Sequence, residues 1–154
     1  MAIASRLDEF LKNKRVGFEV IPHRKTDTAV ETAQADGVPV ALFAKVVMVK
    51  GGGQHAMVVV PADLRVDLFK LQDVLDTPDV KIEHEREFAS AFPDSQPGAM
   101  PPFGVLYGVP CYLDYRMVAW DEIYFNAGDH EESIGMKMVD YLRVAKATIV
   151  DVAA

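Results

Sequence analysis

Cysteine and long apolar runs are both scarce in this sequence. It contains a single cysteine, Cys111, among 154 residues, which excludes an internal disulfide and a zinc cluster built from cysteines. No stretch approaches the roughly 18 consecutive apolar residues of a membrane-spanning helix. The first ten residues contain Arg6, Asp8 and Glu9 in place of the apolar core of a signal peptide. We therefore expect a cytoplasmic protein that does not enter a membrane.

Positive charge is also in deficit. Lys and Arg number 16 against 23 Asp and Glu, which gives a formal net charge of −7 at pH 7. Proteins that hold long nucleic acids rely largely on contacts between basic side chains and phosphates, so we expect no binding to DNA. A pocket that takes only the tip of a nucleic acid needs few local charges, and this composition is compatible with such a pocket.

The residues that are present suit one soluble domain spanning 1–154. Half of them are hydrophobic and a quarter are charged, enough for a single core. Helical periodicity predicts helices over 3–14, 29–36, 67–75, 85–91 and 138–144. Short apolar runs bounded by Gly and Pro predict strands over 16–21, 42–50, 56–60, 80–82, 105–107, 111–114, 122–125 and 132–137. We expect a mixed α/β domain with a largely antiparallel sheet and helices packed on its outside.

The segment from Gly98 to Gly104 reads Gly-Ala-Met-Pro-Pro-Phe-Gly. Pro101 and Pro102 fix φ and lack backbone N–H groups, whereas glycine permits conformations that are closed to other residues. The segment is therefore predicted to be a stiff loop with unpaired carbonyl groups, which a small ligand can approach closely. A plain turn is the alternative interpretation of the same residues.

Two further residues stand out as candidates for binding. Lys45 lies inside the apolar run 42–50, where an unpaired buried ammonium is costly. It either reaches solvent along its alkyl chain or lines a pocket and holds a phosphate or a carbonyl oxygen. His130 follows Asn126-Ala127-Gly128-Asp129 in a turn between two strands, where it is either exposed or donates a hydrogen bond to a ligand or helps to move a proton.

Other combinations of reactive residues are weak. Cys111, Asp114 and His130 do not have the spacing of a thiol hydrolase, and we expect Cys111 to be a buried, inert thiol. The run 129–132 offers carboxylates and a histidine, but neighbours on a strand point to opposite faces, so we expect no metal site. The remaining histidines, His23, His55 and His84, are expected on the solvated surface.

The order of these features along the chain resembles a known family. Lys45 opens an apolar strand, and Gly98–Gly104 follows about fifty residues later. Gly108-Val109-Pro110 and Asp114 come next, and then Ile-Tyr-Phe-Asn-Ala-Gly-Asp-His at 123–130 precedes a final strand and helix. This set resembles the YbaK/prolyl-tRNA editing family of free-standing aminoacyl-tRNA deacylases, related to the editing insertion of bacterial prolyl-tRNA synthetase. The resemblance covers nearly the whole chain.

The resemblance implies a barrel-like sheet and hydrolysis of the ester between a wrong amino acid and the acceptor end of a tRNA, without a cofactor. It implies that Lys45 is the most characteristic functional residue. The loop of Gly98, Ala99, Met100, Pro101 and Pro102 would shape the aminoacyl pocket, and Gly128 and His130 would line it.

The residue that follows Lys45 is compatible with more than one substrate. Some subfamilies have Asn or Thr directly after the lysine, where this chain has Val46, so the amino acid removed (Ala, Cys, Ser or Thr) is not determined. A partner synthetase is a further open question. The main alternative function is a module of the same fold that binds a nucleotide or aminoacyl-tRNA without cleaving it.

Overall fold

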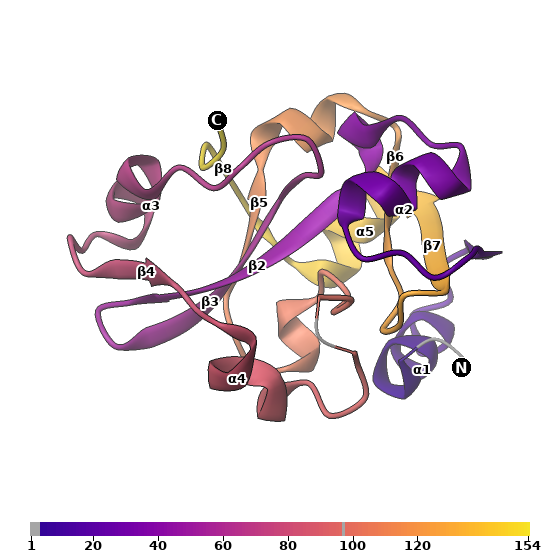
Figure 1. Cartoon of the computed structure of the whole chain (residues 1–154), viewed down its shortest axis with the longest axis horizontal. Helices are drawn as coiled ribbons and strands as arrows, with labels where there is room; N and C mark the ends of the chain where they lie inside the picture. The colour runs from indigo at the N-terminus through magenta and orange to yellow at the C-terminus, as the bar shows by residue number, and fades with distance from the viewer. Residues whose placement is uncertain (1–3, 97) are drawn as a thin grey trace.

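Two β-sheets form the frame of the computed structural model, which describes residues 4–96 and 98–154 (Figure 1). One has the order β1-β7-β6 and is antiparallel. The other has the order β4-β2-β3-β5-β8, with parallel pairing only at β3–β5 and β5–β8. The strands are β1 (Phe18–Pro22), β2 (Ala44–Gly51), β3 (Gln54–Pro61), β4 (Val80–Ile82), β5 (Cys111–Asp114), β6 (Glu122–Asn126), β7 (Glu132–Lys137) and β8 (Thr148–Val150).

Two of the helices begin where a capping side chain places them. The Thr28 side chain accepts a hydrogen bond from Glu31 N, and Gly37 takes a left-handed conformation at φ +71°, so the second helix runs over the predicted residues. The Asp67 carboxylate caps the next helix by accepting from the backbone N–H groups of Phe69 and Lys70. The helices are α1 (Ser5–Asn13), α2 (Ala29–Asp36), α3 (Leu68–Leu75), α4 (Glu85–Phe88) and α5 (Met138–Ala145). No helix in the described ranges is long and apolar enough to cross a bilayer.

Strand β2 is covered on both faces, as its continuous apolar sequence predicts. Ala44, Val46 and Met48 face the larger apolar cluster, which also contains Met100 and Phe103. Val47 and Val49 face a smaller cluster beneath α3. In Figure 1 the three-stranded sheet with α1 and α2 lies at one end of the molecule, and α3 and β4 lie at the other. The strand therefore runs through the middle of the domain and connects its two ends.

The structure and the sequence-based expectations differ at three points. The described residues form two open sheets that meet at an isolated bridge between Phe43 and Tyr124, so a closed barrel is not confirmed. The predicted strand 105–107 is wrong, because Tyr107 N and Val109 N both donate to Gly104 O (3.0 and 3.1 Å) and curl the chain into a 3₁₀ turn. Strand β8 was not predicted, because three β-branched residues are too few to show a period.

Candidate functional site

The turn between β6 and β7 is held by backbone hydrogen bonds against the segment Gly98–Gly104, which is called the Gly98 segment or proline segment below. Gly128 N donates to Ala99 O at 2.9 Å, and Gln96 N donates to Gly128 O at 2.7 Å. His130 N donates to the Gln96 side-chain oxygen at 3.0 Å. The structure therefore brings together four of the residues that the sequence singled out: Gly98, Ala99, Gly128 and His130.

Both glycines in this contact are required by the backbone. Gly98 has φ +80° and Gly128 has φ +109°, in a region that side chains disfavour. A Cβ atom on Gly98 would lie 3.5 Å from Cε1 of His130, so the glycine leaves the imidazole uncovered on that side. A Cβ atom on Gly128 would lie 2.8 Å from Cβ of Ala4, too close for any side chain. One glycine thus preserves space beside His130, and the other lets α1 approach the turn.

The proline segment is more firmly anchored than its sequence suggests. Its carbonyl groups were expected to be unpaired, but Ala99 O accepts from Gly128, Pro101 O accepts from Phe103 N at 2.8 Å, and Pro102 O accepts from the Tyr141 hydroxyl at 2.7 Å. These donors come partly from segments far along the chain, so the sequence could not show them. Met100, Pro101 and Pro102 are buried, so the segment is firmly packed against the core.

Lys45 is half-buried near the start of β2. Its ammonium donates to Leu64 O at 2.6 Å, in the segment between β3 and α3. Burial lowers the pKa of Lys45, the nearby Arg65 lowers it further, and Asp63 partly offsets both effects. A lysine has three N–H donors, the hydrogen bond to Leu64 O uses one of them, and Asp63 compensates the charge only in part. This position is therefore electrostatically suited to an anion.

Among the described residues, no hydrogen bond joins Lys45 to the proline segment, and only the pairing of the strands relates their positions. The parallel bridge between Phe43 and Tyr124 sets the start of β2 beside β6, so that two residues further along lie Lys45 and Asn126. Asn126 leads directly to Gly128. However, Lys45 has the strand parity of Val47 and leaves β2 toward Leu64, whereas Met100 packs on the other face.

Strand β4, the neighbour of β2 on the side opposite β3, does not extend along β2 as far as Lys45. Strand β4 pairs with β2 only at Val49–Gly51. Beyond the isolated bridge at Phe43, the described pairing of β2 with β6 also ends.

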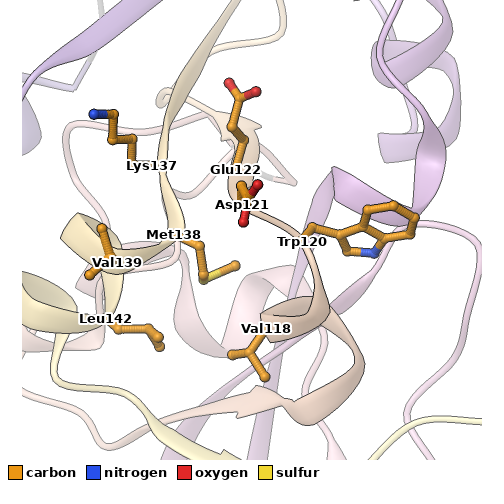
Figure 2. Close-up of a pocket in the computed structure, with 8 residues that line it drawn as sticks. All are labelled: Val118, Trp120, Asp121, Glu122, Lys137, Met138, Val139 and Leu142. Atoms are coloured by element: carbon orange, nitrogen blue, oxygen red, sulfur yellow. The ribbon is translucent and has the colours of Figure 1, made fainter.

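A separate groove lies at the opposite end of the β6–β7 hairpin. It has a volume of about 720 Å³, and Glu122 and Lys137, which pair across the hairpin, stand on its rim (Figure 2). Apolar side chains from α5 and the segment before β6 form most of its wall, and it contains none of the predicted site residues. Its lining residues are Val118, Trp120, Asp121, Glu122, Lys137, Met138, Val139 and Leu142.

The remaining reactive residues are placed away from a hydrolytic role. Cys111 is 7% exposed, and burial raises the pKa of its thiol, which makes a thiolate nucleophile unfavourable. Within the described ranges no three His, Cys, Asp or Glu side chains converge as metal ligands. His55 and His84 are exposed, as expected.

The surface position expected for His23 is wrong. Its side chain is only 2% exposed; Nδ1–H donates to Arg24 O (2.6 Å), and Nε2 forms a hydrogen bond with the Ser133 hydroxyl (3.1 Å). Its backbone N donates to Glu131 O at 2.8 Å, which places it directly beside the turn that carries His130. The contacts span more than a hundred residues of sequence, so no local pattern could have revealed them.

Comparisons with known proteins give one family match, similar curated proteins and similar folds. The family described as the aminoacyl-tRNA editing domain matches residues 23–144. The multifunctional Ser/Thr-tRNA deacylase ProXp-y of Escherichia coli K12 is 28% identical over 151 residues, which cover 95% of this chain and 90% of that protein. The crystal structure of a candidate trans-editing enzyme for prolyl-tRNA synthetase superposes with a TM-score of 0.84 at 23% identity, covering 98% and 96% of the two chains. That of a hypothetical protein has a TM-score of 0.87 at 19% identity, covering 97% of this chain and all of that one.

Proposed function

This chain belongs to the aminoacyl-tRNA editing domain family, and on that basis we propose that it is a trans-editing hydrolase that removes a wrong amino acid from tRNA. The match of the family to residues 23–144 is the observation that carries the proposal. The ester of a small amino acid, Ala, Cys, Ser or Thr, is the proposed substrate. The Ser/Thr-tRNA deacylase activity in the name of the Escherichia coli relative supports this class.

The proposed reaction is attack of water on the ester without a covalent nucleophile. An aminoacyl ester is already activated, so a water molecule held in line and a stabilised oxyanion are sufficient. The buried thiol of Cys111, whose pKa is raised, supports a mechanism in which it takes no part. The ribose hydroxyl beside the ester is a candidate for activating the water.

Lys45 is the proposed anchor for the terminal nucleotide. Burial lowers the pKa of its half-buried ammonium and the nearby Arg65 lowers it further, so a phosphate would stabilise the charged form against both effects. The phosphate would lie on the Leu64 side of β2.

The aminoacyl pocket is assigned to the proline segment and the turn that it contacts. Gly98, Ala99, Met100, Pro101 and Pro102 would form a wall with little freedom to move, and Gly128 and His130 would close it. A stiff wall excludes large side chains through overpacking. In a hydrophobic pocket, two substrates that differ by one methylene differ in binding free energy by only about 1–3 kcal/mol. The discrimination expected among Ala, Ser and Thr is therefore modest. His130 is assigned a positioning role, because its backbone is fixed by Gln96.

A deacylation assay with the purified protein tests the proposal. Ala-, Cys-, Ser- and Thr-tRNA prepared by mischarging are incubated with the protein, and amino acid release is compared with release in buffer alone. Catalytic release of at least one of them is expected without an added synthetase. Binding of aminoacyl-tRNA with no release of any of the four would instead support the non-catalytic module.

A further inference from the structure

The hydroxyl group of Tyr141 holds the far end of the proline segment. Tyr141 lies on α5 and is completely buried. Its hydroxyl donates to Pro102 O at 2.7 Å, across 39 residues of sequence. Burial raises the pKa of Tyr141 well above its ordinary value, so the hydroxyl keeps the proton that it donates. The Pro102 carbonyl is thereby fixed by a group outside the loop.

The near end of the segment is fixed by a different element. Ala99 O accepts from Gly128 N, and Ala99 N donates to Gln96 O at 3.0 Å. Between these two attachments lie Met100, Pro101 and Pro102, and two of these three residues have a fixed φ. A chain this stiff, held at both ends, has very few conformations. Movement at Pro102 must therefore be transmitted toward Gly98.

The ring of Tyr141 could hold the segment in place without its hydroxyl, and the two contributions must be separated. The ring contacts Phe103 in a T-shaped geometry with centroids 5.2 Å apart, and Phe125 at 6.4 Å. The Cys111 thiol is a much weaker donor, 3.9 Å from the same Pro102 carbonyl. Without the tyrosine hydroxyl, a buried carbonyl would be left with no strong partner.

We propose that Tyr141 is a positioning residue of the editing site, which sets the selectivity for amino acid size by fixing Pro102. The inference rests on the proposed function, because it concerns the wall of the aminoacyl pocket. Tyr141 does not touch the substrate. It acts through the segment, so its loss should change which esters fit while leaving tRNA binding near Lys45 unaffected.

Tyr141→Phe in the full chain is the test, because it removes the hydroxyl and keeps the ring. Amide hydrogen exchange at Ala99, Phe103 and Gly128 is expected to accelerate by about tenfold or more, since local opening becomes easier. The ratio of kcat/KM for Ala-tRNA to that for Thr-tRNA is expected to shift at least several-fold, because small displacements of a positioning group cost large factors in rate. KM for tRNA should stay within about twofold.

Two control variants accompany the test. Tyr112→Phe removes a hydroxyl from β5, where the tyrosine packs in the smaller cluster, and Cys111→Ala removes the weaker donor. Both should keep the exchange rates and the selectivity of the wild type. If Cys111→Ala loosened the segment as much as Tyr141→Phe, Tyr141 would not be the controlling group.

The outcomes separate this inference from the proposed function. Wild-type exchange rates in Tyr141→Phe would overturn the positioning role, and faster exchange with an unchanged selectivity ratio would overturn the link to amino acid size. If the wild type hydrolysed none of the esters, the proposed function would fail. The exchange comparison would then still decide whether Tyr141 holds the segment.

Discussion

At the scale of single residues, Lys45 offers the most direct test of the chemistry. Lys45→Met keeps most of the side-chain volume and removes the charge, and we expect deacylation to fall by about 10²-fold or more, as when one essential electrostatic contact is lost. Thermal unfolding should be little changed, because the replaced ammonium is half-buried and its pKa is lowered by desolvation. Lys12→Met on α1, where Lys12 is exposed and pairs with Asp8, is the matched control. Full activity in Lys45→Met would remove this residue from the mechanism.

Gly98 permits an equally sharp comparison, because the chain contains a glycine with nearly the same backbone geometry. Gly98 has φ +80° and Gly53, in the β2–β3 turn, has φ +82°. Alanine should destabilise each by about 1–2 kcal/mol through left-handed strain. A Cβ atom at residue 98 would also lie 3.5 Å from the His130 ring, whereas residue 53 has nothing within 4 Å.

We therefore expect Gly98→Ala to lose activity on Thr-tRNA more than on Ala-tRNA, and Gly53→Ala to change neither. Steady-state hydrolysis of the two esters, with denaturation curves for both variants, checks this. Equal losses in the two variants would indicate that the effect arises from stability alone.

At the scale of elements, local signals in the sequence predict the bounds of a helix such as α2. They do not predict the contacts between segments that are far apart in the chain. The bounds of α2 follow from Thr28, Glu31 and Gly37, which all lie within or next to the helix. The attachment of Pro102 to Tyr141 spans 39 residues, and that of His23 to Ser133 spans 110. Neither contact has a periodic pattern. The site residues that the sequence singled out therefore stay a prediction, and the contacts that hold Pro102 and His23 in place required coordinates.

The end of α2 contains a buried carboxylate whose ionisation should affect stability. The Asp36 side chain is 0% exposed and lies close to the side chains of Ser133 and His23. Its nearest ionisable neighbour is His23, 4.0 Å away. Burial raises the pKa of Asp36, which outweighs the lowering by Ser133 and His23. A raised carboxyl pKa means that the folded state prefers the protonated form, so this contribution to stability is complete below the unfolded pKa of about 3.9. It is lost as the pH rises through the folded pKa.

Asp36→Asn should consequently stabilise the protein at pH 7 relative to the wild type, and less so or not at all at pH 4. Urea denaturation of both proteins at the two pH values measures the difference. Asp140→Asn on α5, where the carboxylate is partly exposed and pairs with Arg143, is the control and should show no such gain. The opposite result would be that Asp36→Asn loses more stability relative to the wild type at pH 7 than at pH 4. It would mean that the fold stabilises the ionised Asp36 carboxylate.

At the scale of the whole molecule, the net charge of −7 limits how tRNA can be held. Each phosphate neutralised by a basic side chain adds about 0.7–0.9 to the slope of log affinity against log salt. We propose Lys45 as one phosphate contact, and Arg65, which acts electrostatically on Lys45, is a candidate for a second; the expected slope then has a magnitude of about 1–2. Proteins that hold many phosphates give slopes several times steeper.

Binding of aminoacyl-tRNA at a series of salt concentrations, under conditions too brief for hydrolysis, measures this slope. Lys45→Met should reduce its magnitude by about one, whereas Lys12→Met should leave it unchanged. A slope steeper than about 4 in the wild type would require several more phosphate contacts. The chain would then bind much more of the tRNA than its acceptor end, and the acidic composition would have to conceal an extended basic face.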